Sequence, residues 1–407
     1  MSEGRPGLWR QPDFTRLFAA STVSNFGTMM SAMAVPWLAI EVLEASDTAV
    51  AGLATLRMLP GWLLSFAVGA WVDRVARKPL LIGADLARAG LYLLLPALYL
   101  WDLLTIEILC AIVVCVAALT VVFSVAVDSF LPLLVARDDL VDANSRLTAG
   151  EATAESAGFF SSGWVASWIG TPFVLAVDAA TFVASALFLV GVRVDERPSE
   201  APQGRLDVRA DLRAGLAELR RVPELRAIAL AETLRGAAFG IFMTAYMLWL
   251  MRDLGFGKAA IGTIAFTGSL GSIAGAWLVL RMQRALGNPR TLVASLLLAA
   301  SSYLLIPLAP DTAWLGWACL VGHQVLGDTF DTTWNISSLS TRQRLSDPAL
   351  LGRVNGFVSN VFSLAMFTSA TTCTLLVGWT GTRPLLFVSA ALPALAALSV
   401  RRALRPF

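Results

Sequence analysis

Long apolar runs separated by short polar stretches form the pattern of this chain. There are twelve of them, and each is close to the length of about 20 residues at which an α-helix crosses about 30 Å of hydrocarbon. Their ranges are 18–40, 49–72, 80–100, 106–127, 148–169, 173–192, 227–250, 261–280, 292–308, 314–337, 354–377 and 385–400. Because the runs are continuous, they predict an all-α integral membrane protein with twelve transmembrane helices. The run at 148–169 is the most polar, since it contains Glu151 and Glu155.

Composition agrees with this interpretation. Of the 407 residues, 57% are hydrophobic and 15% are charged, whereas soluble domains have roughly 45–50% apolar and roughly 25% charged residues. The four cysteines lie inside apolar runs without paired spacing, so neither a disulfide framework nor a zinc site is expected. No basic run is long enough to follow a phosphate backbone. We therefore expect no metal, no cofactor and no nucleic acid among the partners.

The positive residues are distributed unevenly between the loops. Most of them fall in the loops on the side of both termini, including the long stretch after residue 192. Positive charge marks the cytoplasmic loops of membrane proteins, so both termini are predicted to be cytoplasmic in a multi-pass cell-membrane protein. Residues 1–11 lack the apolar core of a signal peptide, so the first run is expected to remain as an anchor. Arg outnumbers Lys by 29 to 2, which favours a GC-rich bacterial genome and a bacterial inner membrane.

The second half of the chain repeats features of the first. The tripeptide at 69–71, Gly-Ala-Trp, recurs at 275–277, and Pro12 before the first run matches Pro223 before the seventh. Such spacing is typical of two parallel six-helix repeats. The predicted domains are an N-terminal bundle at 1–195, a cytoplasmic linker at 196–225 and a C-terminal bundle at 226–407. Within the linker, leucine and valine spacing over 206–222 predicts an amphipathic helix.

The segment 69–78, GAWVDRVARK, lies between the second and third runs. It resembles the signature loop of major facilitator superfamily transporters, although Ala76 stands where the family usually has glycine. The resemblance implies two pseudo-symmetric six-helix bundles that transport by alternating access. In the family, this loop, the cytoplasmic end of the fourth helix and the start of the eleventh form a latch that holds the halves together. The matching residues here are Gly69, Asp73, Arg74, Arg77, Lys78, Asp128, Gly352 and Arg353.

Three further stretches, at 131–135, 178–182 and 352–354, are similar to the drug-efflux branch that includes macrolide pumps and the enterobactin exporter. This resemblance implies a secondary active transporter that exports a drug-like or natural-product small molecule by proton antiport. Its expected partners are that substrate, protons and membrane lipids, and it is expected to act as a monomer. In this fold the first, fourth, seventh and tenth helices line the cavity.

Ionisable side chains inside a membrane are costly and usually functional. Four candidates for proton coupling lie in the seventh and tenth runs: Asp328, Glu232, Asp331 and His323. Glu232 could instead only neutralise Arg235, three residues away, Asp331 could be solvated at the cytoplasmic edge, and His323 could be a packing residue. Candidates for the substrate cavity share the faces of the same helices and of the first. They are Asn25, Met29, Arg235, Phe239, Met243, Tyr246, Gln324 and Asn335.

Other function classes remain open at this stage. A carrier of the same fold could move lysophospholipids or other lipids through a lateral opening, and a non-transporting sensor could share the sequence pattern. A polytopic membrane enzyme would need clustered His, Asp or Glu, or a nucleophile pair. The chain has one histidine and no phosphate-binding or nucleophile motif, so we do not expect an enzyme.

The charge asymmetry predicts the topology. A cysteine at Lys258 should be labelled by a membrane-impermeant maleimide in intact cells, whereas a cysteine at Arg213 should be labelled only after permeabilisation. The measurement is gel-shift labelling in a background without the native cysteines. The reverse labelling pattern would contradict the orientation.

Overall fold

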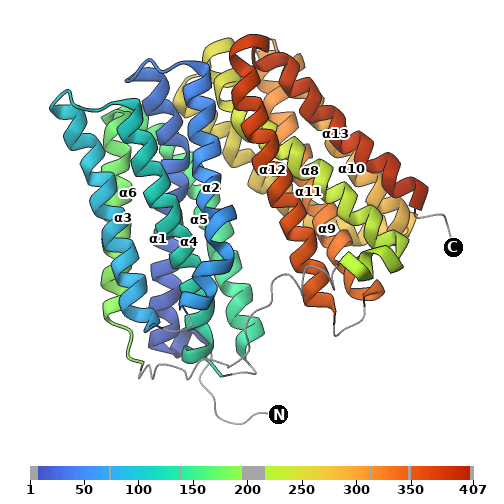
Figure 1. Ribbon diagram of the computed structural model, residues 1–407, viewed down its shortest axis with the longest axis horizontal. Coiled ribbons are helices and arrows are strands. Elements are labelled where there is room, and N and C mark those ends of the chain that lie inside the picture. The colour runs from blue at the N-terminus through green and yellow to red at the C-terminus, as the bar shows by residue number, and fades with distance from the viewer. Residues whose placement is uncertain are drawn as a thin grey trace. The chain divides into compact units, whose positions relative to one another are not determined.

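The computed structural model describes residues 8–72, 75–136, 139–194, 216–310, 314–346 and 350–403. These residues form twelve long helices and no strands (Figure 1), which confirms the predicted all-α class. The helices are α1 (Pro12–Glu41), α2 (Asp47–Val72), α3 (Arg77–Leu100), α4 (Ile106–Leu134), α5 (Leu140–Ile169), α6 (Thr171–Val190), α8 (Pro223–Leu248), α9 (Lys258–Leu286), α10 (Asn288–Leu308), α11 (Trp314–Leu345), α12 (Leu351–Thr380) and α13 (Thr382–Ala403). A short 3₁₀ turn, Leu8–Arg10, precedes α1, and a π-helical turn, Trp249–Asp253, continues α8.

The helix ends follow local chemistry. Proline occupies the first turn of α1, α6, α8 and α10, where its missing N–H would have no helical partner. A single glycine separates α5 from α6 and α12 from α13. These glycines, Gly170 and Gly381, have φ of +90° and +74°, a conformation that other residues rarely adopt. Each is followed by a threonine, so the repeat extends to the tight connections between helices.

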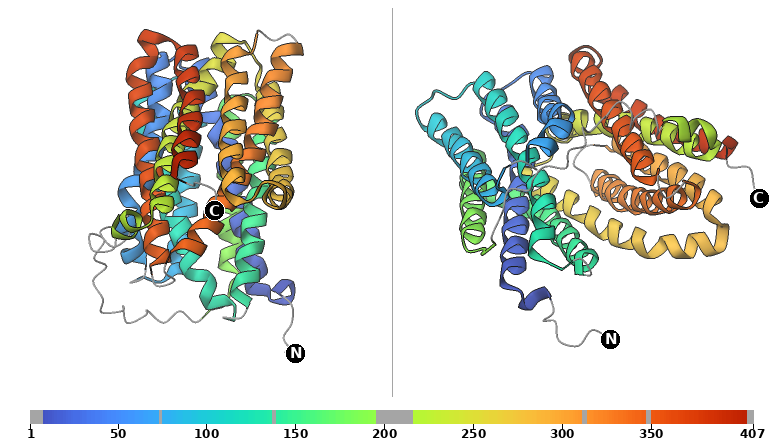
Figure 2. Two further views of the ribbon diagram at one scale, coloured as in Figure 1. Left: turned by 90° about the vertical axis from the view of Figure 1, so that its right-hand side faces the viewer. Right: turned by 60° about the horizontal axis from the view of Figure 1, so that its bottom comes forward.

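The chain divides into two compact units, 1–45 with 56–204 and 46–55 with 205–407. In the first unit α1 packs on α5 and α6, and α3 packs on α4 and α6. In the second unit α8 packs on α12 and α13, and α10 packs on α11 and α13. The pairings correspond helix by helix, which confirms two pseudo-symmetric bundles (Figure 2).

The predicted linker at 196–225 falls mainly outside the described residues. Of its amphipathic helix, residues 216–221 are described as helical. Leu219 is buried in a cluster with Leu225, Val354 and Val358, so the last turn of this segment packs on the second unit.

Nine of the described helices are long and apolar enough to cross a membrane, by length and composition; α2, α5 and α11 are the long helices outside this set. Charged residues explain why α5 and α11 are outside this set. Glu151 and Glu155 dilute α5, and Asp328 and Asp331 lie in the middle of α11.

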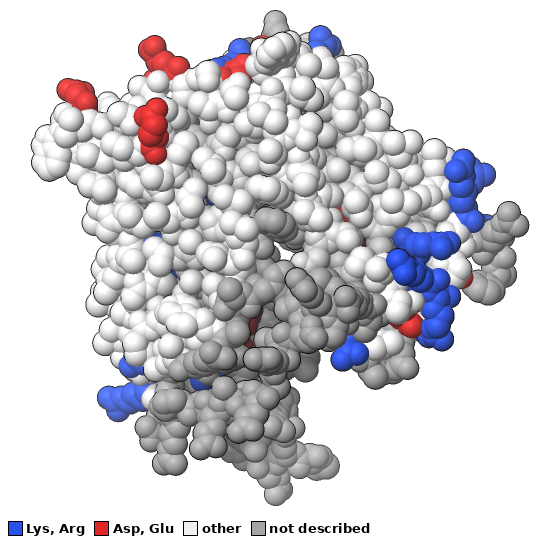
Figure 3. Space-filling model, in the orientation of Figure 1, with Lys and Arg blue, Asp and Glu red and all other residues white. Residues whose placement is uncertain are grey.

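Charged side chains of the described residues mark the two ends of the first unit. Over α3 and α4, Figure 3 shows acidic side chains at the upper end, basic side chains at the lower end and a broad uncharged band between them. The sequence accounts for this polarity, because α3 begins at Arg77 and Lys78, and Asp102 and Glu107 flank the turn between α3 and α4. An apolar band between charged ends is what a bilayer requires.

Glycine permits the closest helix contacts of the second unit. A Cβ atom added at Gly236 of α8 would lie 2.3 Å from the carbonyl oxygen of Phe362 in α12. One added at Gly271 of α9 would lie 2.3 Å from the carbonyl oxygen of Val325 in α11. Each has a second glycine four residues later, Gly240 and Gly275, with contacts of 2.2 and 2.3 Å. Small residues at this spacing let helix backbones approach each other in membranes.

These contacts predict that Gly236→Ala and Gly271→Ala each destabilise the protein by about 1–3 kcal/mol, because backbone must move to admit the methyl group. The measurement is the thermal melting of the detergent-solubilised protein by size-exclusion chromatography. Gly90→Ala is the matched control, since Gly90 lies within α3 and has open space around it. Equal melting temperatures for all three variants would contradict the packing argument.

Candidate functional site

An ionic network joins α8 to α11 inside the second unit. The Arg235 guanidinium forms ion pairs with the carboxylates of Glu232, at 2.7 Å, and Asp331, at 3.0 Å. It also donates a hydrogen bond of 3.1 Å to Asn335 Oδ1. The fold thus brings together Arg235 and three other residues that the sequence singled out.

Glu232 is the most firmly held of these carboxylates. Besides the ion pair, its Oε1 accepts hydrogen bonds from Trp334 Nε1 at 2.8 Å and from Ser338 Oγ at 3.4 Å. Glu232 is buried. The i, i+3 neutralisation of Glu232 by Arg235 is therefore present, and it belongs to a larger network.

Asp328 lies one turn before this network on α11. Its Oδ2 accepts a hydrogen bond of 3.0 Å from Gln324 Nε2. The carboxylate packs against Gly268 of α9, where an added Cβ atom would lie 2.0 Å from Oδ2. Asp328 is only partly buried, so it combines a neutral amide partner with access to its surroundings.

His323 is 4% exposed and sits among aromatic rings. The ring centroids of Tyr303, Phe242 and Tyr246 lie 5.0, 5.5 and 6.2 Å from its own. These contacts give His323 a packing role among aromatic side chains of α8 and α10, and a role as proton relay stays a prediction.

The first unit contains a buried ionic cluster that is not among the sequence-based site candidates. Arg88 of α3 donates hydrogen bonds to Asp85 on the same helix, to Ser24 of α1 at 3.1 Å and to Thr120 of α4 at 3.4 Å. Phe123 and Phe182 flank the guanidinium, with ring centroids 4.4 and 4.2 Å from its carbon. The i, i+3 spacing of Asp85 and Arg88 was the available signal, and sequence analysis does not reveal the aromatic rings on two other helices.

Asp178 of α6 lies near this cluster and is fully buried. It accepts hydrogen bonds from the hydroxyl groups of Ser31 and Thr181, the latter at 3.2 Å. The Ser31 contact ties α6 to α1, which is a structural role for a residue that the family resemblance highlighted.

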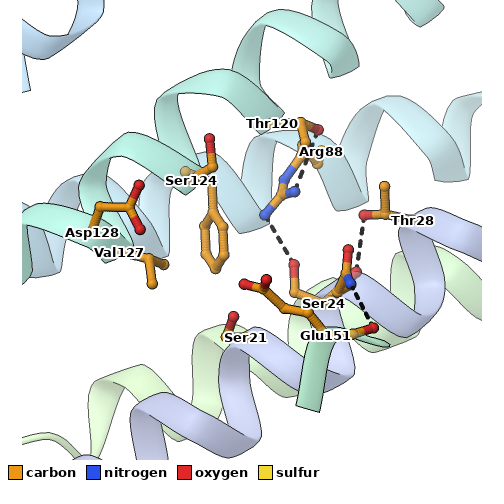
Figure 4. A pocket seen from close by; sticks show the side chains of 11 residues that line it. Ser21, Ser24, Thr28, Arg88, Thr120, Ser124, Val127, Asp128 and Glu151 are labelled. Carbon is orange, nitrogen blue, oxygen red and sulfur yellow. Dashed lines mark hydrogen bonds between the residues drawn. The ribbon is translucent and has the colours of Figure 1, made fainter. Parts of the chain in front are cut away.

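A polar pocket opens beside Arg88 within the first unit (Figure 4). It occupies about 440 Å³, including the space at its open mouth. Four helices line it, with side chains from α1 (Ser21, Ser24, Asn25 and Thr28), α3 (Arg88), α4 (Thr120, Phe123, Ser124, Val127 and Asp128) and α5 (Glu151). Nearly all of these side chains are polar.

The remaining cavity candidates are spread over both units. Asn25 Nδ2 donates a hydrogen bond of 3.3 Å to the backbone oxygen of Glu151, and Met29 packs where Gly158 of α5 approaches α1. In α8, Tyr246 stacks on Phe242 at 4.5 Å, Phe239 lies 6.4 Å from Phe362, and Met243 is exposed.

Only part of the predicted latch is described. Asp73 and Arg74 lie outside the described residues, Gly69 and Gly352 belong to α2 and α12, and Arg353 is exposed on α12. Arg77 is buried at the start of α3. Lys78 Nζ donates to the backbone oxygens of Val190 and Val192, at 2.9 and 2.7 Å, and so caps the end of α6. Asp128 faces the polar pocket, and the latch itself stays a prediction.

Comparisons with known proteins agree on the architecture. A family model described as Major Facilitator Superfamily matches residues 17–370. The fold is similar to the nucleoside transporter NupG (TM-score 0.75, 12% identity, covering 97% of this chain and 99% of that one). It is also similar to an inward-facing bacterial homologue of the iron transporter ferroportin (TM-score 0.73, 16% identity, covering 98% of this chain and 99% of that one). A bacterial homologue of the human lysosomal transporter Spinster is similar too (TM-score 0.71, 12% identity, covering 98% of this chain and 99% of that one). At these identities the likeness concerns the fold. A search of curated protein sequences found no significant match.

The network predicts the effect of removing its cation. Arg235→Met should destabilise the protein by about 3–5 kcal/mol, because Glu232 and Asp331 lose the charge that both contact. The measurement is thermal melting in detergent, with Arg252→Met at an exposed ion pair as control. Adding Asp331→Asn to Arg235→Met should restore part of the loss, and a double variant no more stable than the single one would contradict the shared pairing.

Proposed function

Because the chain belongs to the major facilitator superfamily, we propose that it is a secondary active transporter that exports a small organic molecule in exchange for protons by alternating access. The cargo is a drug-like or natural-product molecule. The resemblance of three sequence stretches to efflux pumps supports the direction of transport. The fold itself accommodates unlike cargo, since nucleoside and iron transporters share it, so the choice depends on side chains.

The observation that supports the proton coupling is the presence of three carboxylates close together in α8 and α11. Glu232 and Asp331 share ion pairs with one guanidinium, that of Arg235, and Asp328 lies one turn away. Arg342, in the last turn of α11, adds an attraction for Glu232. A carboxylate in a membrane-spanning helix is costly when ionised without a cation. Binding a proton removes that cost, and releasing the proton restores the charge.

The three carboxylates are not equivalent candidates. Glu232 is buried and held by an arginine, a tryptophan and a serine, so a change in its protonation would disturb the whole network. Asp331 is held by its ion pair with Arg235. Asp328 is partly buried and bonded to a neutral amide. Asp328 is therefore the first candidate for the proton carrier, and Asp331 is the second.

The experiment is substrate flux in proteoliposomes with and without an imposed pH gradient. Asp328→Asn mimics the protonated carboxyl permanently, so it should abolish uphill export while downhill exchange continues. Glu232→Gln is the matched control, which should lower stability more than coupling because it weakens the contacts to Arg235 and Trp334. If Asp328→Asn still concentrates substrate against its gradient, another carboxylate carries the proton.

A further inference from the structure

The polar pocket of the first unit has a chemistry that the proposed function does not yet use. Several of its hydrogen-bond donors are already occupied. Arg88 donates to Asp85, Ser24 and Thr120, and Asn25 Nδ2 donates to the backbone oxygen of Glu151.

Two hydroxyl groups at the wall also donate their hydrogen to other acceptors. Thr28 donates to the backbone oxygen of Ser24 at 2.9 Å, and Ser124 donates to that of Val121 at 3.0 Å. A hydroxyl group has one hydrogen to donate and two lone pairs. With the hydrogen directed into its own helix, each oxygen has lone pairs left to accept a hydrogen bond.

Two carboxylates add the strongest acceptors. Asp128 of α4 and Glu151 of α5 both line the pocket, and Figure 4 shows them on different helices with carboxyl groups turned towards the space between. Neither carboxylate forms an ion pair with another residue in the described ranges, and the charge of Asp128 acts unfavourably on that of Glu151. A cation placed between them would relieve this repulsion.

Two hydrophobic side chains complete the wall. Phe123 and Val127 are its apolar members, and the face of Phe123 is covered by the Arg88 guanidinium. A lipophilic quaternary cation would find neither an open aromatic face nor a use for the acceptors. A ligand with several N–H and O–H donors would use them.

We propose that this pocket is a binding subsite for a hydrophilic organic amine, in which a protonated amino group lies between Asp128 and Glu151 and neighbouring hydroxyl groups donate to Thr28 and Ser124. The proposal rests on the proposed transport function and narrows its cargo to a hydroxylated ammonium compound. It also gives Asp128 a ligand-binding role, where the family resemblance implied a place in the latch.

The test uses the full-length protein in detergent and radiolabelled glucosamine as the probe, which carries an ammonium group among hydroxyl groups. Glucosamine should bind saturably. Glucose, which lacks the charge, and tetraethylammonium, which lacks the donors, should compete at least about tenfold more weakly, since charge-assisted hydrogen bonds are the strong ones. Absence of saturable glucosamine binding would overturn the proposal. Competition by glucose or tetraethylammonium as strong as that by unlabelled glucosamine would also overturn it. Stronger competition by Mn²⁺ than by unlabelled glucosamine would do the same, because it would indicate a metal-ion site.

Variants locate the subsite. Asp128→Asn and Glu151→Gln should each weaken glucosamine binding about tenfold or more. Glu155→Gln is the matched control, because Glu155 lies one turn further along α5 and is not part of the pocket wall. A melting temperature within a few degrees of that of the wild type establishes that a variant is folded. Weaker glucosamine binding by one folded variant is enough to support the subsite. Unchanged binding in both would place the amine elsewhere.

Flux measurements separate the two proposals. If wild-type protein binds glucosamine as expected but moves no amine under a pH gradient, the transport function fails and the subsite stands. If gradient-driven flux is present but Asp128→Asn and Glu151→Gln leave it unchanged, the subsite fails and the transport function stands.

Discussion

The cost of a charge inside membrane-spanning helices governs the interior of this protein. Each unit contains an arginine that contacts an acid three residues earlier on its own helix, Arg88 with Asp85 and Arg235 with Glu232. Apolar residues in place of these ion pairs would leave a bundle of similar stability, so stability alone does not explain why the charges are present. In the second unit Arg235 also pairs with Asp331, so two carboxylates share one guanidinium.

Close helix packing supports these networks. Gly236 lets α12 approach the helix that carries Arg235, and Gly271 lets α11 approach α9. Backbones in such contact have little freedom to shift, since a packed interior transmits strain. The positions of the carboxylates relative to Arg235 are therefore set by glycines that carry no charge.

Much of the architecture could be predicted from the sequence. The apolar run 80–100 became α3, Arg77–Leu100, and the run 292–308 became α10, Asn288–Leu308, because hydropathy reports burial in lipid directly. The ends were underestimated where helices continue past the hydrocarbon with polar residues. Less of the candidate site could be predicted. The pairing of Arg235 with Glu232 follows from spacing on one helix, whereas its contact with Asp331 spans 96 residues. The acceptor character of the pocket depends on which way each hydroxyl donates, and composition contains no such information.

The two ionic networks are not copies of each other, although the bundles are. The repeat relates α1 to α8 and α3 to α10 by their packing partners, yet Arg88 lies on α3 and Arg235 lies on α8. Duplicated helices therefore carry charges at positions that the duplication does not relate. The shared packing serves the same requirement in both units, which is a stable bundle in lipid. The unshared charges give the two units different interiors. The first unit has two carboxylates at a polar pocket, and the second unit has two carboxylates paired with one arginine.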